Sequence, residues 1–150
     1  MVKYLNRTLK ICIKAFLTLI GGIFLFVLFW FAYLGVTILL ETTIYHDNPQ
    51  ELGQDTLRSI LALLVGVLTL LLMRTKLNET IKGMLLLAGL AAFLTALVLL
   101  LYMIMWLAVS LVVLVSAIVI WILIKKRKSW IYFYAVGLGV LIALLYAWPR

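Results

Sequence analysis

The longest uncharged stretch of the chain sets its architecture. It covers 42 residues, Gly83 to Ile124, without a single Asp, Glu, Lys or Arg. As one α-helix it would be roughly 63 Å long, about twice the ~30 Å hydrocarbon core of a bilayer. The length therefore predicts two membrane spans joined by a turn. We place the turn near Tyr102 and Trp106, because amphipathic aromatic rings favour the headgroup level.

The composition places the whole chain in a membrane. Hydrophobic residues make up 67% and charged residues 12% of the sequence, against about 45–50% and 25% in soluble domains. One cysteine excludes an intramolecular disulfide, and one histidine excludes a bis-histidine haem or a multi-histidine metal cage. We therefore expect no cofactor. The net charge of +8 lies beside apolar segments, which favours anionic lipid headgroups over nucleic acid as its partner.

The 150 residues are predicted to form one polytopic domain, an all-α bundle of five transmembrane helices. The second span needs a start near Pro49, with Asn48 as N-cap, because only 15 uncharged residues separate Arg58 from Arg74. Aromatic residues are distributed around the first span, which indicates that much of its surface faces lipid. The predicted spans cover about residues 15–40, 50–73, 82–101, 105–124 and 130–148.

The basic residues predict the orientation of the bundle. With five spans, the N-terminal segment, the loop 74–82 and the cluster 125–128 share one side and carry four, three and four of the 13 Lys and Arg residues. Such an excess marks the cytoplasmic side, so we expect a cytoplasmic N-terminus and an extracytoplasmic C-terminus. The charge asymmetry and the lack of a targeting signal fit a bacterial inner membrane.

Two groups of basic residues are predicted to anchor the chain at anionic lipid headgroups. The first lies on one face of an amphipathic lead-in, residues 1–14, where its members recur at spacings of 4, 3 and 4. A docking face for a protein partner is the alternative for this lead-in. The second group closes the fourth span. The anchors are Lys3, Arg7, Lys10, Lys14, Lys125, Lys126, Arg127 and Lys128.

Small residues recur at every fourth position along two of the spans. This spacing allows helix backbones to approach closely in a membrane. We expect the ribbon of the fifth span to pack against that of the third, and a contact with another subunit is the alternative. The fifth-span ribbon is Ala135, Gly139, Ala143 and Ala147, and the third-span ribbon is Ala88, Ala92 and Ala96.

Four of the five acids in the chain gather between residues 41 and 55, on the predicted outer side. A solvated loop is the leading interpretation, because the outer side of a positive-inside protein carries few basic residues. The alternatives are a contact with the outer surface of a partner and a site for a divalent cation. The residues concerned are Glu41, His46, Asp47, Glu51 and Asp55.

The spans carry little chemistry. No span centre contains an ionisable residue, and no phosphate loop, HExxH, CxxC or credible Ser-His-Asp set occurs. We therefore expect that the protein is not an enzyme. The hydroxyl groups inside the spans are expected to bond back to their own helices. They belong to Thr18, Thr37, Thr69, Thr95, Ser110 and Ser116.

Three classes of function remain open. The leading one is a small non-catalytic inner-membrane protein that acts through helix–helix contacts with a membrane partner, as an accessory or regulatory subunit or an immunity-type protein. The second is a small channel or carrier that works as a homo-oligomer, with Ser and Thr lining a path between protomers. The third is a membrane enzyme or metal-dependent protein that uses the outer acidic loop.

Overall fold

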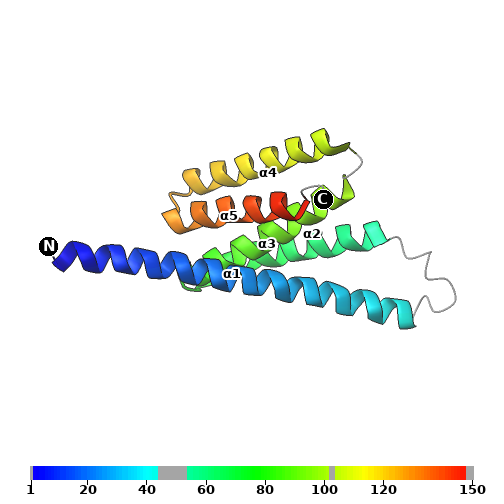
Figure 1. Cartoon of the computed structure of the whole chain (residues 1–150), viewed down its shortest axis with the longest axis horizontal. Coiled ribbons are helices and arrows are strands. Elements are labelled where there is room, and N and C mark those ends of the chain that lie inside the picture. Colours follow the sequence, from blue (N-terminus) through cyan, green and yellow to red (C-terminus); the bar gives the residue numbers. More distant parts are fainter. Residues whose placement is uncertain (1, 44–53, 102–103, 148–150) are drawn as a thin grey trace.

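The structure, a computed structural model, describes residues 2–43, 54–101 and 104–147, with the backbone alone described at 2–7, 40–41, 54–59, 62–63, 70 and 146–147. The described chain is all-helical, as predicted. Successive helices run in opposite directions, so the α2–α3 and α4–α5 connections lie at the same end of the bundle (Figure 1). The helices are α1 (Val2–Thr43), α2 (Gln54–Met73), α3 (Glu79–Leu100), α4 (Met105–Lys125) and α5 (Trp130–Ala147).

The uncharged stretch folds back on itself where its length requires it. α3 ends at Leu100 and α4 begins at Met105. The N–H of Leu101 donates to the Leu97 carbonyl at 3.2 Å, and the N–H of Ile104 donates to the Leu101 carbonyl at 2.8 Å. These two bonds satisfy backbone groups at the end of α3 and at the start of α4. The predicted hairpin is therefore confirmed, and it forms without Gly, Pro, Asn or Asp in the turn.

The predicted lead-in continues into the first span without a break. α1 is one helix of 42 residues, about 63 Å long at 1.5 Å per residue. The helix is continuous at Lys14, where the Thr18 hydroxyl donates to the Lys14 carbonyl at 2.8 Å. The start of α1 extends beyond the ends of the other helices (Figure 1). If α1 crosses the bilayer, its basic end leaves the membrane along the helix axis.

Among the described residues, three helices are long and apolar enough to cross a membrane. They cover Thr8–Leu39, Glu79–Leu100 and Met105–Lys125. Within the described chain, the apolar parts of α2 and α5 are shorter, at Leu64–Met73 and Trp130–Leu145. The long helices match the ~20 residues that a hydrocarbon core requires. They indicate an integral membrane protein.

Helix α3 forms the centre of the bundle. It makes its most extensive contacts with α1, α2 and α5, while α4 contacts α5 and α3 at the edge of the molecule (Figure 1). Leu87, Ala88, Ala91 and Leu94 of α3 are completely buried. A helix that is apolar on all sides has no preferred outer face and suits such a central place.

Candidate functional sites: helix contacts and an aromatic cavity

The small residues of α5 lie against α3. Ala135, Gly139 and Ala143 are buried. A Cβ atom on Gly139 would lie 3.4 Å from the Leu87 carbonyl oxygen and 3.5 Å from the Ala91 amide nitrogen. The backbones of α5 and α3 therefore approach each other at this glycine, and the contact is made within the chain.

The other members of the two predicted ribbons differ in burial. Ala88 is completely buried, whereas Ala92 and Ala96 are half-buried. Ala147 lies at the end of α5, where the backbone alone is described. Ala92 and Ala96 lie at a cavity between α3, α1 and α2, whereas Gly139 of α5 lies against Leu87 and Ala91.

Four further glycines in the described helices lie at close contacts with α3, among them Gly21 of α1, where an added Cβ would meet the Met84 side chain. A Cβ on Gly22 of α1 would lie 2.9 Å from the Leu87 side chain, and one on Gly83 of α3 would lie 2.9 Å from Ile131 of α5. A Cβ on Gly89 would overlap the Thr69 side chain of α2. α1, α2 and α5 therefore each meet α3 where a glycine removes side-chain volume.

Two exposed glycines have no such neighbour. Gly35 of α1 and Gly137 of α5 have nothing within 4 Å of an added Cβ. Gly35 lies one helical turn from Phe31 and from Leu39, which are 63% and 62% exposed. It therefore leaves a notch in a bulky apolar surface, and we call Phe31, Gly35, Ile38 and Leu39 the α1 notch surface.

The basic anchors of the α4–α5 turn lie beside aromatic rings. The Lys125 ammonium is 5.2 Å from the centre of the Trp121 ring, and the Lys128 ammonium is 5.6 Å from the centre of the Tyr132 ring. Cation–π contacts of this length are attractive. Such pairs are typical of the headgroup level, where aromatic belts and lysines meet.

The same turn contains a strained backbone position. Arg127 has a φ of 47°, a left-handed conformation that L-residues other than Gly, Asn and Asp rarely adopt. Its N–H donates to the Ile124 carbonyl, and the Lys128 N–H donates to the Leu123 carbonyl, both at 3.0 Å. This is the Schellman pattern of helix ends. The turn therefore presents its basic side chains from a hydrogen-bonded helix end.

The other predicted anchors belong to α1. Lys10 and Lys14 are exposed. Lys3 and Arg7 lie in the part of α1 where only the backbone is described. The α2–α3 loop, with exposed Arg74, lies at the same end of the bundle as the α4–α5 turn (Figure 1).

The five predicted residues of the outer acidic loop lie outside the described residues or have only their backbones described. His46, Asp47 and Glu51 lie outside the described residues, as does the expected helix start at Pro49. Glu41 and Asp55 are described by their backbones in α1 and α2. Within the described ranges, no three His, Cys, Asp or Glu residues are grouped as metal ligands. The partner-contact and cation interpretations of this loop both stay predictions.

One hydroxyl inside the helices behaves differently from the others. The Oγ1 of Thr95 is buried and has no hydrogen-bond partner, in a residue that is 3% exposed. The other five hydroxyl groups donate to a carbonyl four residues earlier, as predicted. These pairs are Thr18 to Lys14, Thr37 to Tyr33, Thr69 to Val65, Ser110 to Trp106 and Ser116 to Val112.

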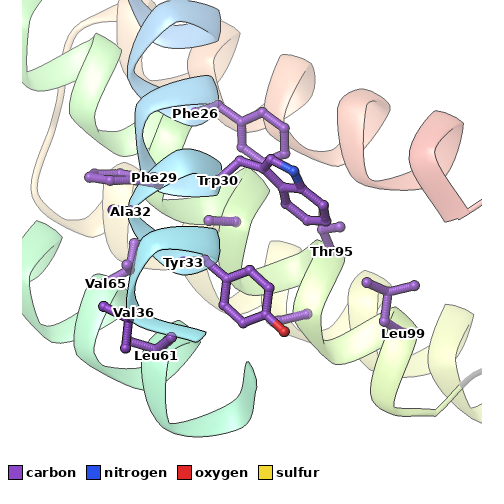
Figure 2. Close-up of a pocket in the computed structure, with 12 residues that line it drawn as sticks. Phe26, Phe29, Trp30, Ala32, Tyr33, Val36, Leu61, Val65, Thr95 and Leu99 are labelled. Atoms are coloured by element: carbon purple, nitrogen blue, oxygen red, sulfur yellow. The ribbon is translucent and has the colours of Figure 1, made fainter. Parts of the chain in front are cut away.

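Thr95 lines a cavity of about 140 Å³ between α1, α2 and α3. Figure 2 shows Trp30 and Tyr33 of α1 on the side of Thr95 and Leu99, and Phe29 and Val36 of α1 on the side of α2. The residues that line the cavity are spaced so that each helix contributes one face to its wall. They are Phe26, Phe29, Trp30, Ala32, Tyr33 and Val36 of α1, Leu61 and Val65 of α2, and Ala92, Thr95, Ala96 and Leu99 of α3.

The aromatic residues of α1 lie partly on its exposed surface and partly on the wall of the cavity. Phe16, Phe24 and Phe31 are 61–63% exposed, as expected for a lipid-facing surface. Trp30 and Tyr33 are half-buried and line the cavity, with ring centres 5.8 Å apart. The spacing of 26, 29, 30 and 33 is a helix-face pattern. This pattern is not apparent in the sequence, because aromatic residues also occupy the opposite face of the helix.

Comparison with known proteins finds no relative of this chain. No protein-family model matches the chain, and searches of curated proteins and of solved structures find no match. The fold defines the class, an α-helical integral membrane protein. Its candidate binding features are the α1 notch surface and the aromatic cavity.

Proposed function

We propose that the chain is a small non-catalytic protein of a bacterial inner membrane that binds a membrane partner through helix–helix contacts. In this proposal it forms a single domain of five spans, with its N-terminus in the cytoplasm and its C-terminus outside. It acts as an accessory, regulatory or immunity-type protein. The observation that carries the proposal is the open notch at Gly35.

The five-span topology is supported by helix lengths and by the position of the charges. α2 has 20 residues and α5 has 18, which correspond to about 30 Å and 27 Å. These lengths fit a hydrocarbon core of about 30 Å. The basic α2–α3 loop and α4–α5 turn lie at one end of the bundle (Figure 1), which favours that end as the cytoplasmic one.

The notch favours a helical partner because of how helices associate in lipid. Burial of apolar surface gives little driving force there, since lipid tails are as apolar as leucine. Association depends on close packing, which small residues permit. Gly22, Gly83, Gly89 and Gly139 serve contacts inside the chain. Gly35 and Gly137 have no internal neighbour, and the side chains one turn from Gly35, those of Phe31 and Leu39, are more than 60% exposed.

The acidic outer loop would form a second part of the contact with the partner. In the five-span topology, α1 ends on the outer side, with Glu41 in its last turn and the other three acids of 41–55 after it in the chain. A partner helix on the outer half of α1 would bring its own outer loop to these residues. A basic outer loop on the partner is the chemistry that complements them.

The test uses two matched substitutions, Gly35→Leu and Gly137→Leu. Both glycines are exposed and have open space around them, so neither leucine meets an internal clash. The protein is purified from native membranes in mild detergent through an N-terminal tag, and the intact complex is measured by mass spectrometry. We expect a stoichiometric partner with the wild type and with Gly137→Leu, and its loss with Gly35→Leu.

Three outcomes count against this function. A wild-type protein recovered as a monomer would contradict a stable partner. Recovery as a homo-oligomer would replace the proposal with the channel or carrier, and flux through liposomes would then be measured. Equal partner recovery with both leucine variants would remove the notch from the contact.

A further inference from the structure

We propose that the aromatic cavity is a binding site for a lipophilic molecule with a single six-membered ring and one oxygen substituent. In this site the Thr95 hydroxyl donates a hydrogen bond to that oxygen, and the rings of α1 cover the ligand ring. The proposal concerns a small molecule. It does not depend on a protein partner at the α1 notch surface.

The first argument is the hydrogen-bonding state of Thr95. A buried hydroxyl without a partner is unfavourable because it has lost its hydrogen bonds to water, and in a helix a threonine can avoid this cost by donating to the carbonyl four residues earlier. Five other hydroxyl groups in the helices do so. Thr95 does not, and its residue lines the cavity. A ligand oxygen in the cavity would satisfy it.

The second argument is a comparison with two other hollows of the bundle. One, of about 480 Å³, contains Ser110, and the other, of about 300 Å³, contains Thr69. Both hydroxyl groups donate to their own helices, to the carbonyls of Trp106 and Val65. These hollows therefore offer apolar space without an unused donor. Only the cavity at Thr95, among these three, combines apolar space with such a group.

The third argument is size. A cavity of about 150 Å³ with an apolar lining binds benzene in an engineered protein. The cavity at Thr95 has about 140 Å³, so it has room for a single six-membered ring.

The fourth argument is the shape of the walls. Trp30 and Tyr33 are tilted by 42° to each other, and Phe26 lies beside Trp30 (Figure 2). Aromatic rings favour offset or edge-to-face contacts with another ring. On the other side, Ala92 and Ala96 leave space next to Thr95. The walls are therefore suited to a flat ring more than to a flexible chain.

The cavity can be reached from the lipid. Ala32 and Val36, which line it on α1, are exposed at the surface of the bundle. In the proposed topology this part of α1 lies in the outer half of the bilayer. A ligand dissolved in the membrane could therefore enter sideways without crossing a charged region.

The experiment measures binding of 4-fluorophenol and fluorobenzene to the full chain in lipid nanodiscs by fluorine NMR. Empty nanodiscs give the partition into lipid, which is subtracted. We expect saturable binding of 4-fluorophenol, about tenfold tighter than that of fluorobenzene, because one hydrogen bond to a buried donor is of this magnitude. Thr95→Val keeps the side-chain shape and removes the hydroxyl, so the preference should disappear.

Two further variants make the result specific. Thr18→Val removes a buried hydroxyl that lies outside the cavity and bonds to Lys14, and it should keep the tenfold preference. Ala96→Phe fills the cavity and should weaken both probes, and its helix content by circular dichroism is compared with that of the wild type. Absence of saturable binding to the wild type would overturn the proposal. A preference that survives in Thr95→Val would also overturn it.

Discussion

Gly137 and Gly139 lie two residues apart on α5 and meet different surroundings. Gly139 faces the α3 backbone at Leu87 and Ala91, while Gly137 has open space. One substitution made at both positions therefore separates helix packing from helix propensity. Within the described helices, Gly137 is therefore a close control for the effect of a substitution at Gly139.

We predict that Gly139→Leu lowers the unfolding free energy by about 1–3 kcal/mol, the range for overpacked sites. Gly137→Leu should not lower the unfolding free energy, because leucine is a better helix former than glycine by about 0.8 kcal/mol. The measurement is unfolding in mixed micelles with increasing SDS. Equal stability of the two variants would show that α5 does not rest on α3 at Gly139.

The α4–α5 turn allows a second prediction at this scale. Arg127→Gly should stabilise the protein by about 0.5–1 kcal/mol, because glycine adopts a φ of 47° without steric cost. Lys126→Gly removes the same charge at a φ of −86°, where no strain is relieved. The same unfolding assay compares them. A gain from Lys126→Gly that equals the gain from Arg127→Gly would assign the effect to charge.

Several residues of the two sites could be predicted from their spacing, and others could not. The fifth-span ribbon is visible because small residues repeat at four-residue intervals around Gly139. Thr95 is not distinguishable from Thr69 in the sequence, because both lie in apolar helices. Their difference arises from the three-dimensional neighbourhood, where Thr69 bonds to Val65 and Thr95 lacks a partner.

At the element scale, helix boundaries follow from length and charge. The hairpin between α3 and α4 could be predicted because the uncharged stretch is twice the thickness of a bilayer and its middle carries Trp106. Helix faces are harder to predict. α3 is apolar on all sides, so its sequence has no periodic pattern that predicts which helix packs on which face. The cavity therefore required the structure.

The continuity of α1 gives a prediction at the element scale. Spin labels at Leu9 and Ile38, both exposed, in a Cys12→Ser background, should lie about 44 Å apart along one helix. A lead-in that bends by a right angle near Lys14 would shorten this distance to about 37 Å. Electron spin resonance in nanodiscs measures it. A distribution centred on the shorter value would contradict a straight α1.

At the scale of the whole molecule, α3 holds the other helices together, and the charges orient the bundle. We predict that alkaline phosphatase fused after Arg150 is active and that the same enzyme fused before Met1 is inactive, because phosphatase folds only outside the cytoplasm. Removal of the basic residues 125–128 should weaken this asymmetry. An inactive C-terminal fusion that is made in full would contradict the five-span topology.

The central claim is that the outer half of α1 binds a membrane partner, and photo-crosslinking in native membranes tests it most directly. A photoreactive phenylalanine replaces Phe31 or Ile38 on the α1 notch surface, or Leu141 or Leu145 on α5, all of them exposed. We predict one discrete protein adduct from positions 31 and 38 and none from 141 and 145. Lipid adducts alone at all four positions would contradict the claim.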